Sequence, residues 1–179
     1  MELLADEPRV KYAVPMEYEP LASFSCGDTY PWERELNGMF RSLARGRSPD
    51  IVAVRVAEDK ETGAFIGAGC YLPLPLTLMP GPDIEDAACI PALGISEEFR
   101  GRRMPDETRI GAFLIADILA EIKLAWDDEM PPVWAIVAKG NTPCHEVVEA
   151  HGFGIVEATE GDYDLWFRQR GLDPAWWLS

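Results

Sequence analysis

The sequence has few of the residues that metal sites and disulfide frameworks require. It contains two histidines, and its four cysteines, Cys26, Cys70, Cys89 and Cys144, are widely spaced without a Cys-x-x-Cys pair. Structural zinc sites use closely spaced Cys and His ligands, so the sequence predicts no metal. Reduced thiols in a cytosolic protein are the simplest interpretation of such cysteines.

Positive charge is also scarce. The chain has 16 Lys and Arg residues against 31 Asp and Glu residues, which gives a net charge of −15 at pH 7. Phosphate backbones are bound by basic surfaces, so this balance argues against nucleic acid as a main partner. An acidic surface favours solubility, and it also attracts cationic ligands such as amines.

Long apolar runs are absent as well. No stretch reaches the roughly 20 apolar residues of a membrane-spanning helix. The N-terminus lacks the basic start and apolar run of a signal peptide, so we expect a cytoplasmic protein without a membrane partner. With 179 residues and 47% apolar content, the sequence predicts a single domain over residues 1–179 with a sizeable core.

Periodicity and turn residues predict an alternation of strands and helices. We expect strands over 9–15, 51–56, 64–74, 87–96, 133–138, 153–157 and 163–168, and helices from Pro31 to about 45, over 108–126 and over 142–151. Thr142 is the expected N-cap of the last helix. This order predicts the α/β class, with a mixed sheet covered by helices.

The strand at 87–96 is apolar on both faces, which is typical of a central strand. Pro91 cannot donate a hydrogen bond to a neighbouring strand, so pairing is interrupted there or the residue lies at a bulge. Period-two counting places Glu85 and Cys89 on the same face as Leu93.

The turn after this strand carries most of the functional signal. Arg100, Gly101, Arg102, Arg103 and Arg109 gather there in an otherwise acidic chain. The long helix that follows begins with unpaired N–H groups, and a helix N-terminus beside cationic side chains is a ready anion site. The turn therefore predicts a small polyanionic ligand, with an exposed turn that binds nothing as the alternative.

The segment Leu93-Gly-Ile-Ser-Glu-Glu-Phe-Arg-Gly101, followed by a long helix, a strand, Asn141 and Gly152-Phe153, resembles the GNAT family of acyl-CoA-dependent N-acyltransferases. The family signature is Leu-x-Val-x-Pro-x-x-[Arg/Gln]-x-x-Gly-x-[Gly/Ala]. The chain departs from it at Glu97, which stands in place of proline. Extra residues at about 103–108 also precede the matching Ile110-Gly111-Ala112. Asp106 and Glu107 in this insertion could pair with the neighbouring arginines.

The resemblance implies the GNAT fold, a central and mostly antiparallel sheet with a splayed strand and flanking helices. It implies acetyl-CoA as co-substrate and no metal. The pantetheine amides would meet the splayed strand, and the pyrophosphate would meet the arginine-rich turn and the first helical turn. The implied coenzyme contacts are Leu93, Gly94, Ile95, Arg100, Gly101, Arg102, Arg103, Arg109, Ile110, Gly111, Ala112 and Asn141.

The implied activity is N-acetyl transfer from acetyl-CoA to a primary amine of a small or cationic acceptor. Cys89 occupies the place of a basic glutamate found in some members, and Glu85 could act one step further back. Either residue could instead be structural. The acceptor would lie between residues 24–40, the proline-rich loop at 73–82 and the segment 163–177.

In many members a tyrosine protonates the leaving thiolate, and Val148 stands at its position here. Cys144, Tyr163, Tyr71 or water could substitute, or the step could proceed unassisted, because a thiol of pKa about 8.5 needs little help near neutral pH.

Two rival interpretations and the oligomeric state stay open. One rival is a catalytically silent GNAT fold that binds acyl-CoA or a protein partner. The other follows from Phe24-Ser-Cys-Gly27, which is similar to a GNAT branch of toxins that acetylate aminoacyl-tRNA, although the net charge argues against that substrate. The amine could belong to a small molecule or a protein, and a homodimer is compatible with the sequence.

Overall fold

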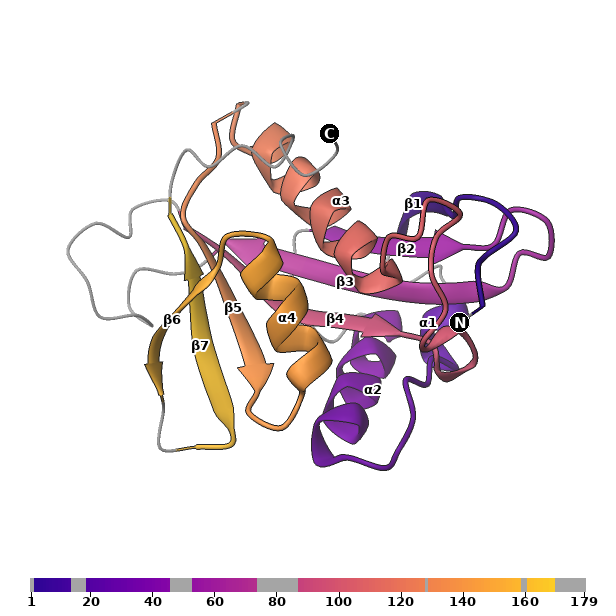
Figure 1. Cartoon of the computed structure of the whole chain (residues 1–179), viewed down its shortest axis with the longest axis horizontal. Coiled ribbons are helices and arrows are strands. Elements are labelled where there is room, and N and C mark those ends of the chain that lie inside the picture. Colours follow the sequence, from indigo (N-terminus) through magenta and orange to yellow (C-terminus); the bar gives the residue numbers. More distant parts are fainter. Residues whose placement is uncertain are drawn as a thin grey trace.

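The computed structural model describes residues 2–13, 19–45, 53–73, 87–127, 129–158 and 161–169. These residues form one mixed sheet of seven strands in the order β1-β2-β3-β4-β5-β7-β6, with helices on both faces (Figure 1). The elements are β1 (Arg9–Ala13), α1 (Glu19–Ala22), α2 (Pro31–Ala44), β2 (Ala53–Glu58), β3 (Phe65–Pro73), β4 (Ala88–Ile95), a 3-10 turn (Glu97–Phe99), α3 (Ile110–Ala125), β5 (Val133–Ala138), α4 (Thr142–Ala150), β6 (Gly154–Ala158) and β7 (Tyr163–Arg168).

The predicted fold class and the order of the predicted elements are confirmed. All neighbouring strands pair antiparallel except β4 and β5, which pair parallel. The short helix α1 was not predicted, because its four residues are too few to show a helical period. Glu85, most of the proline-rich loop and the segment after residue 169 lie outside the described residues.

Helix α3 is the centre of the core on one face of the sheet. It is apolar nearly all round, and it buries Leu114, Ile115, Ile118, Leu119 and Ile122, each contributing roughly 1.5–3 kcal/mol of burial free energy. Its close approach depends on glycines in β3. A Cβ atom at Gly69 would lie 2.2 Å from Cδ1 of Ile118, so a side chain there would force the end of Ile118 to move. In the described part of the chain, no helix combines the length and apolar character needed to cross a membrane.

Helices α1 and α2 cover the opposite face of the sheet. Their buried cluster joins both helices to β2, β3 and β4, and it contains Leu21, Phe24, Phe40, Leu43, Val54, Val56, Ala68 and Ala92. The edges of the Phe24 and Phe40 rings meet in a T-shaped contact, with centroids 4.8 Å apart. Helix α2 therefore lies across β4 on the side away from α3 (Figure 1).

Strand β4 is irregular at Pro91, as the sequence predicts. Cys70 of β3 pairs with Ala92 of β4, but Leu72 pairs with Cys89, so β4 holds one extra residue between these pairs. Pairing with β5 begins at Ala88 and extends no further than Ile90 opposite Ala135. Both expectations for this strand, a bulge and a splay from its neighbour, are confirmed.

The bulge corrects one prediction. An extra residue reverses which face the following side chains occupy. Cys89 lies in a cluster with Ala87 and Trp134, whereas Leu93 packs on the clusters around α3. Cys89 and Leu93 therefore do not share a face, and the period-two count across Pro91 was wrong.

The tight contact between β3 and β4 gives a stability test. A Cβ atom at Gly67 would lie 2.6 Å from the carbonyl oxygen of Gly94 and 2.9 Å from Cδ1 of Leu114. We expect Gly67→Ala to lower the free energy of unfolding by about 1–3 kcal/mol, because backbone atoms would have to move. Gly38→Ala is the control, because Gly38 lies inside α2 with nothing within 4 Å of its Cβ position.

The control should raise the free energy of unfolding by about 0.4–1 kcal/mol, since alanine favours the helix. Urea unfolding of the two variants and the parent measures both effects. Equal stability of Gly67→Ala and the parent would contradict the packing described here.

Candidate functional site

Two adjoining cavities lie where β4 and β5 separate. The larger has a volume of about 610 Å³ and extends to the first turn of α3. The smaller has a volume of about 240 Å³ and lies between α2, β5 and β7. Both are lined by Trp32, Leu36, Leu93, Asn141, Cys144 and Val147. The shared walls make the two cavities parts of one groove that begins at the splay.

The larger cavity collects the residues predicted to bind coenzyme A. Its walls contain Leu93, Gly94, Ile95, Arg100, Gly101, Arg102, Arg103, Arg109, Ile110, Gly111 and Asn141. Ala112 is the one predicted contact that does not line it, and the Ala112 backbone is hydrogen-bonded to the buried ring of His151. The strand, the turn and the helix are thus brought together as the sequence predicts.

The insertion forms a compact loop that closes on itself. Arg103 and Arg109 face each other in an antiparallel bridge, and the N–H of Met104 donates to the carbonyl of Thr108 at 2.8 Å. The Met104 side chain is buried with Ile110 and Leu114. Because the loop begins and ends at the same place, α3 starts directly beside Arg103.

The arginines pair with carboxylates outside the insertion. Arg100 lies 2.6 Å from Glu33, Arg102 lies 3.5 Å from Glu2, and Arg109 pairs with Glu146 at 2.5 Å. Within the insertion, the Asp106 carboxylate instead accepts the N–H of Thr108 at 2.9 Å. Arg103 donates to the backbone carbonyl, not the side chain, of Glu107. The ion pairs of the described residues thus differ from the expected pairing with Asp106 and Glu107.

The first turn of α3 provides the predicted anion site geometry. The N–H groups of Ile110, Gly111 and Ala112 have no helical acceptor, and they carry the positive end of the helix dipole. No acidic residue occupies this turn, although the chain has 31 Asp and Glu residues. Gly111 lines the cavity, so the backbone there is open to a ligand.

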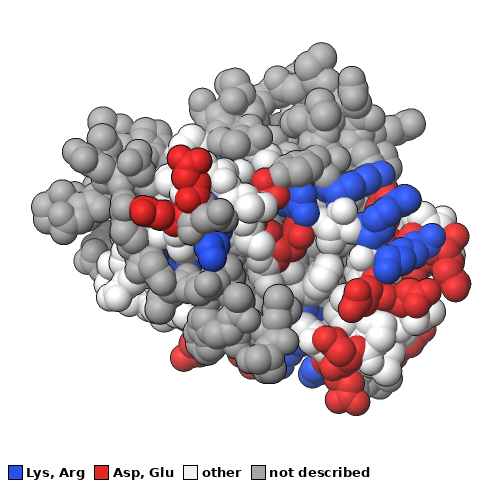
Figure 2. All heavy atoms as spheres, turned by 90° about the horizontal axis from the view of Figure 1, so that it is seen from above, with Lys and Arg blue, Asp and Glu red and all other residues white. Residues whose placement is uncertain are grey.

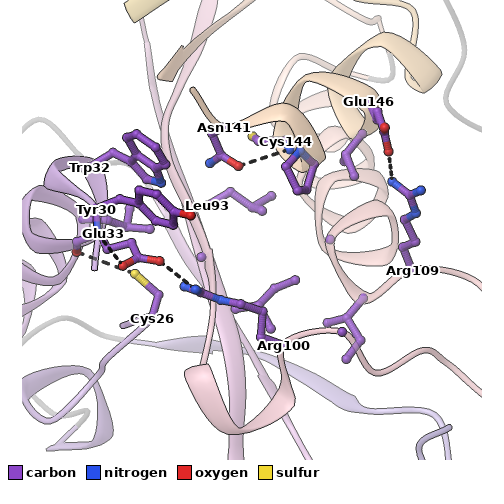
Figure 3. A pocket seen from close by; sticks show the side chains of 18 of the residues that line it. Cys26, Tyr30, Trp32, Glu33, Leu93, Arg100, Arg109, Asn141, Cys144 and Glu146 are labelled. Carbon is purple, nitrogen blue, oxygen red and sulfur yellow. Dashed lines mark hydrogen bonds and ion pairs between the residues drawn. The ribbon is translucent and has the colours of Figure 1, made fainter. Parts of the chain in front are cut away.

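A buried carboxylate stands opposite this turn. The Glu33 side chain, 3% exposed, accepts the N–H of Tyr30 at 2.9 Å and pairs with Arg100 (Figure 3). Burial raises the pKa of Glu33, but the hydrogen bond from Tyr30 and the charge of Arg100 outweigh burial and hold the pKa below its ordinary value. The pair ties the start of α2 to the arginine-rich turn.

The loop before α2 is clamped by Asn37. The Asn37 side chain accepts the N–H of Cys26 at 2.9 Å and donates to the carbonyl of Gly27 at 2.7 Å. Gly27 has φ of 105°, a conformation that favours glycine. A Cβ atom there would also lie 3.1 Å from the Glu33 carboxylate. Burial raises the pKa of the Cys26 thiol to about 11.

The two aromatic residues at the start of α2 form part of the cavity wall. The Tyr30 and Trp32 rings are stacked, with centroids 4.4 Å apart. A Cβ atom at Gly140 would lie 3.0 Å from the Trp32 ring, so the indole rests on the turn between β5 and α4. This contact joins α2 to the turn after β5. Asn141 follows that turn and, rather than Thr142, caps α4, with its side chain oxygen 3.4 Å from the N–H of Cys144.

Some of the predicted catalytic residues line the smaller cavity and others do not. Cys144, Val148 and Tyr163 line it, whereas Cys89 and Tyr71 line neither cavity. Burial raises the pKa of the Cys144 thiol to about 11. The Tyr163 hydroxyl donates to the carboxylate of Glu35, which joins β7 to α2.

Sequence reasoning missed Glu33 and Glu35. Periodicity favours apolar residues for the buried face of a helix, but Glu33 and Asn37 are the buried residues in the first turns of α2. A weak signal existed, because a glutamate three residues after the N-cap is typical of a capping box, and Glu33 stands at that distance from Tyr30. Glu35 had no sequence signal, since a charged residue on a helix is usually solvated.

Charge on the described surface is mixed. Viewed from above, some of the visible Lys and Arg side chains form a short row beside Asp and Glu side chains, and others lie apart from it (Figure 2). Arg100, Arg102 and Arg109 likewise each lie beside a glutamate. Among the described residues, no group of three His, Cys, Asp or Glu side chains is arranged to hold a metal ion.

Comparison with known proteins shows the fold. No family model and no curated protein matches the sequence. Among solved structures, the AtaTR complex bound with AcCoA is 13% identical, with 97% of this chain and 99% of that chain covered and a TM-score of 0.66. The PaiA N-acetyltransferase of Thermoplasma acidophilum in complex with coenzyme A is 15% identical, with 90% and 98% covered and a TM-score of 0.61.

A GNAT-family acetyltransferase of Listeria monocytogenes is also similar, with 15% identity, 94% and 98% coverage and a TM-score of 0.61. Identities at this level establish the fold alone. The chain has the fold of the GNAT acetyltransferases, and the resemblance read from residues 93–101 is confirmed at that level.

The pair between Glu33 and Arg100 predicts a pH dependence of stability. A lowered pKa means that the Glu33 carboxylate stabilises the fold above its ordinary pKa of 4.5, and that this contribution is lost as the pH falls through the lowered value. Glu33→Gln should therefore be less stable than the parent at pH 7, by about 1.5–3 kcal/mol. The difference should shrink as the pH falls below the ordinary value.

Thermal unfolding of parent and variant between pH 3 and pH 7 measures this difference. Glu98→Gln is the control, because Glu98 is exposed on the 3-10 turn beside the same site. A stability difference for Glu33→Gln that stays constant with pH would show that the carboxylate charge does not stabilise this turn.

Proposed function

We propose that the protein is an acyl-CoA-dependent N-acyltransferase that transfers an acetyl group from acetyl-CoA to a primary amine. The observation that carries the proposal is the splay of β4 from β5, whose pairing ends at Ile90. The larger cavity lies beside this splay and extends to the first turn of α3, which contains no acidic residue. This places a strand edge, arginines and helix N–H groups along one groove. Similar solved structures hold acetyl-CoA or coenzyme A, which supports the proposal at the level of the fold.

The chain's own residues fit the parts of coenzyme A. Phosphate oxygens suit the N–H groups at Ile110 and Gly111, because a helix N-terminus stabilises anions. Arg102 and Arg109 line the same cavity and carry forked donors that match phosphate. The pantetheine amides suit the edge of β4 at Leu93 to Ile95, because β4 is no longer paired with β5 there. Coenzyme A, when bound, supplies the activated thioester.

The transfer itself is attack of an amine nitrogen on the thioester carbonyl carbon. Holding both reactants in one groove can lower the barrier by roughly 7–11 kcal/mol. The amine must be neutral to attack, and an ordinary alkylammonium has a pKa near about 10.4, so a proton acceptor is needed. Glu85 stays a prediction for that role, and Cys89 is a weaker candidate because it faces a separate apolar cluster.

The acceptor and the partners also belong to this proposal. The net charge of −15 favours a cationic small molecule or a protein amine over nucleic acid, and we place the protein in the cytoplasm. One similar structure is a toxin bound to the C-terminus of its antitoxin and acetyl-CoA, which keeps a protein partner open. Val148 in the wall of the smaller cavity supports a second candidate, a GNAT fold that binds acyl-CoA without transferring the acyl group.

Gly111→Asp tests the coenzyme site. Its Cβ atom would have ordinary contacts, 3.5 Å from Ile95 and 3.6 Å from Val147, and an acidic residue in a first helical turn favours the helix. Folding should therefore be preserved, while the negative charge repels the pyrophosphate. We expect the affinity for coenzyme A, measured by calorimetry, to fall about tenfold or more, which corresponds to about 1.4 kcal/mol.

Gly38→Asp adds the same charge at an open position of α2 and should bind as the parent does. Thiol release from acetyl-CoA with a panel of amines then separates the two candidate functions. Coenzyme binding with thiol release identifies the transferase, and binding without release identifies the silent fold. Unchanged affinity of Gly111→Asp would remove the assignment of this site.

A further inference from the structure

The smaller cavity has an apolar wall with one charged side chain. Its volume is about 240 Å³, and its apolar walls come from α2, β4, β5, α3 and α4: Leu36, Met39, Ile90, Leu93, Ile115, Ala135, Val137, Val147 and Val148. Among the described residues that line it, Glu35 alone is charged. An apolar cavity with a single carboxylate at an exposed position suits a molecule with one cationic end.

The carboxylate is connected to a proton donor on a second element, β7. The Tyr163 hydroxyl donates to Glu35, and Tyr163 itself lines the same cavity. Tyr163 pairs with Ala138 at the end of β5, directly before the turn that leads to Cys144 and Val148. The pair therefore links α2 to β7 at the wall of the cavity, beside the place where β4 and β5 separate.

Acyl transfer to an amine requires two proton movements. The attacking nitrogen must lose a proton, and the sulfur of the leaving thiolate gains one. Of the other groups in this cavity, Cys144 is a thiol whose pKa burial raises to about 11, and Val148 has no proton to give. Glu35 and Tyr163 are an acceptor and a donor already joined by a hydrogen bond.

We propose that the smaller cavity receives a primary monoamine with an apolar body, and that Glu35 and Tyr163 carry a proton from its nitrogen to the sulfur of coenzyme A. The proposal rests on the acyltransferase function proposed above. It adds the class of acceptor and the two residues that move the proton.

The step balances when one proton goes to solvent. The bound ammonium first releases a proton to water, the neutral amine nitrogen then forms a bond to the carbonyl carbon, and the carbon–sulfur bond breaks with its electron pair on sulfur. Glu35 takes the second proton from nitrogen, and Tyr163 gives its hydroxyl proton to the thiolate. Glu35 then returns a proton to the Tyr163 oxygen through their hydrogen bond, so both residues are restored.

The apolar wall selects the acceptor. An aliphatic or aromatic body gains free energy when it leaves water for side chains such as Leu36 and Met39. A second ammonium group in the cavity would lose its hydration without a second carboxylate to pair with. Monoamines should therefore be better acceptors than diamines of the same length.

The test uses steady-state kinetics of thiol release with acetyl-CoA and matched alkyl monoamines and diamines. We expect Tyr163→Phe to lower kcat about 10²-fold with unchanged affinity for coenzyme A. The phenyl ring keeps the packing but lacks the hydroxyl proton that the thiolate would take. Glu35→Gln should lower kcat/KM for the amine about 10²-fold. Glu98→Gln, an exposed carboxylate that lines neither cavity, should leave all values unchanged.

The double variant distinguishes a relay from two structural roles. If one proton path uses both residues, Tyr163→Phe with Glu35→Gln should lose about as much as the more impaired single variant. Fully additive losses would overturn the relay. Preference for diamines would overturn the acceptor class, and single variants within about twofold of the parent would overturn the role of both residues while the acyltransferase function stands.

Failure of the parent to release thiol with any amine is a different result. It would overturn the proposed function, and this inference with it. Calorimetry with coenzyme A on every variant keeps loss of coenzyme binding separate from loss of proton transfer.

Discussion

One interruption of backbone pairing determines the rest of the site. Pro91 lacks an N–H, and β4 holds one residue more than β3 at this point, so the strand cannot stay paired on both sides. Beyond Ile90 the edge of β4 turns away from β5. A sheet that stayed closed here would have no space between its central strands, and α3 and α4 would pack on a continuous surface. The two cavities, and the strand edge at Leu93, exist because that pairing ends.

The arginines around the larger cavity have two separate roles, and burial distinguishes them. Arg102 and Arg109 pair with Glu2 and Glu146, whose side chains are 70% and 53% exposed. Such exposed pairs are worth about 0–1 kcal/mol, so a phosphate group can replace either carboxylate at little cost. Arg100 is itself 46% exposed, but it pairs with a carboxylate that is only 3% exposed, so breaking this pair leaves a buried carboxylate without its cation. Arg100 therefore holds α2 against the turn, while its neighbours are available for the ligand.

Local patterns in the sequence predicted the elements, the splay and the gathering of arginines at the start of α3, because each of these follows from near neighbours in the chain. The periods of the strands and helices, the missing N–H of Pro91 and the arginines after β4 are all local features. The conformation of residues 104–108 could not be predicted, since it depends on a bridge between Arg103 and Arg109 and on burial of Met104 among distant residues. The face of Cys89 was predicted wrongly because alternation does not continue through a bulge.

The geometry of helix α2 explains why sequence periodicity did not predict the roles of Glu33 and Glu35. Successive residues of a helix are separated by about 100°, so Glu33 and Glu35 point in directions roughly 200° apart. One reaches Arg100 beside the anion site and the other reaches Tyr163 on β7, while Trp32 rests on the turn after β5. A search for one apolar stripe treats such charges as solvated. Here a single helix serves as a wall of both cavities, so its polar residues meet partners on more than one side. Their positions are explained only by the surfaces that the splay of β4 creates, because these are the surfaces that they face.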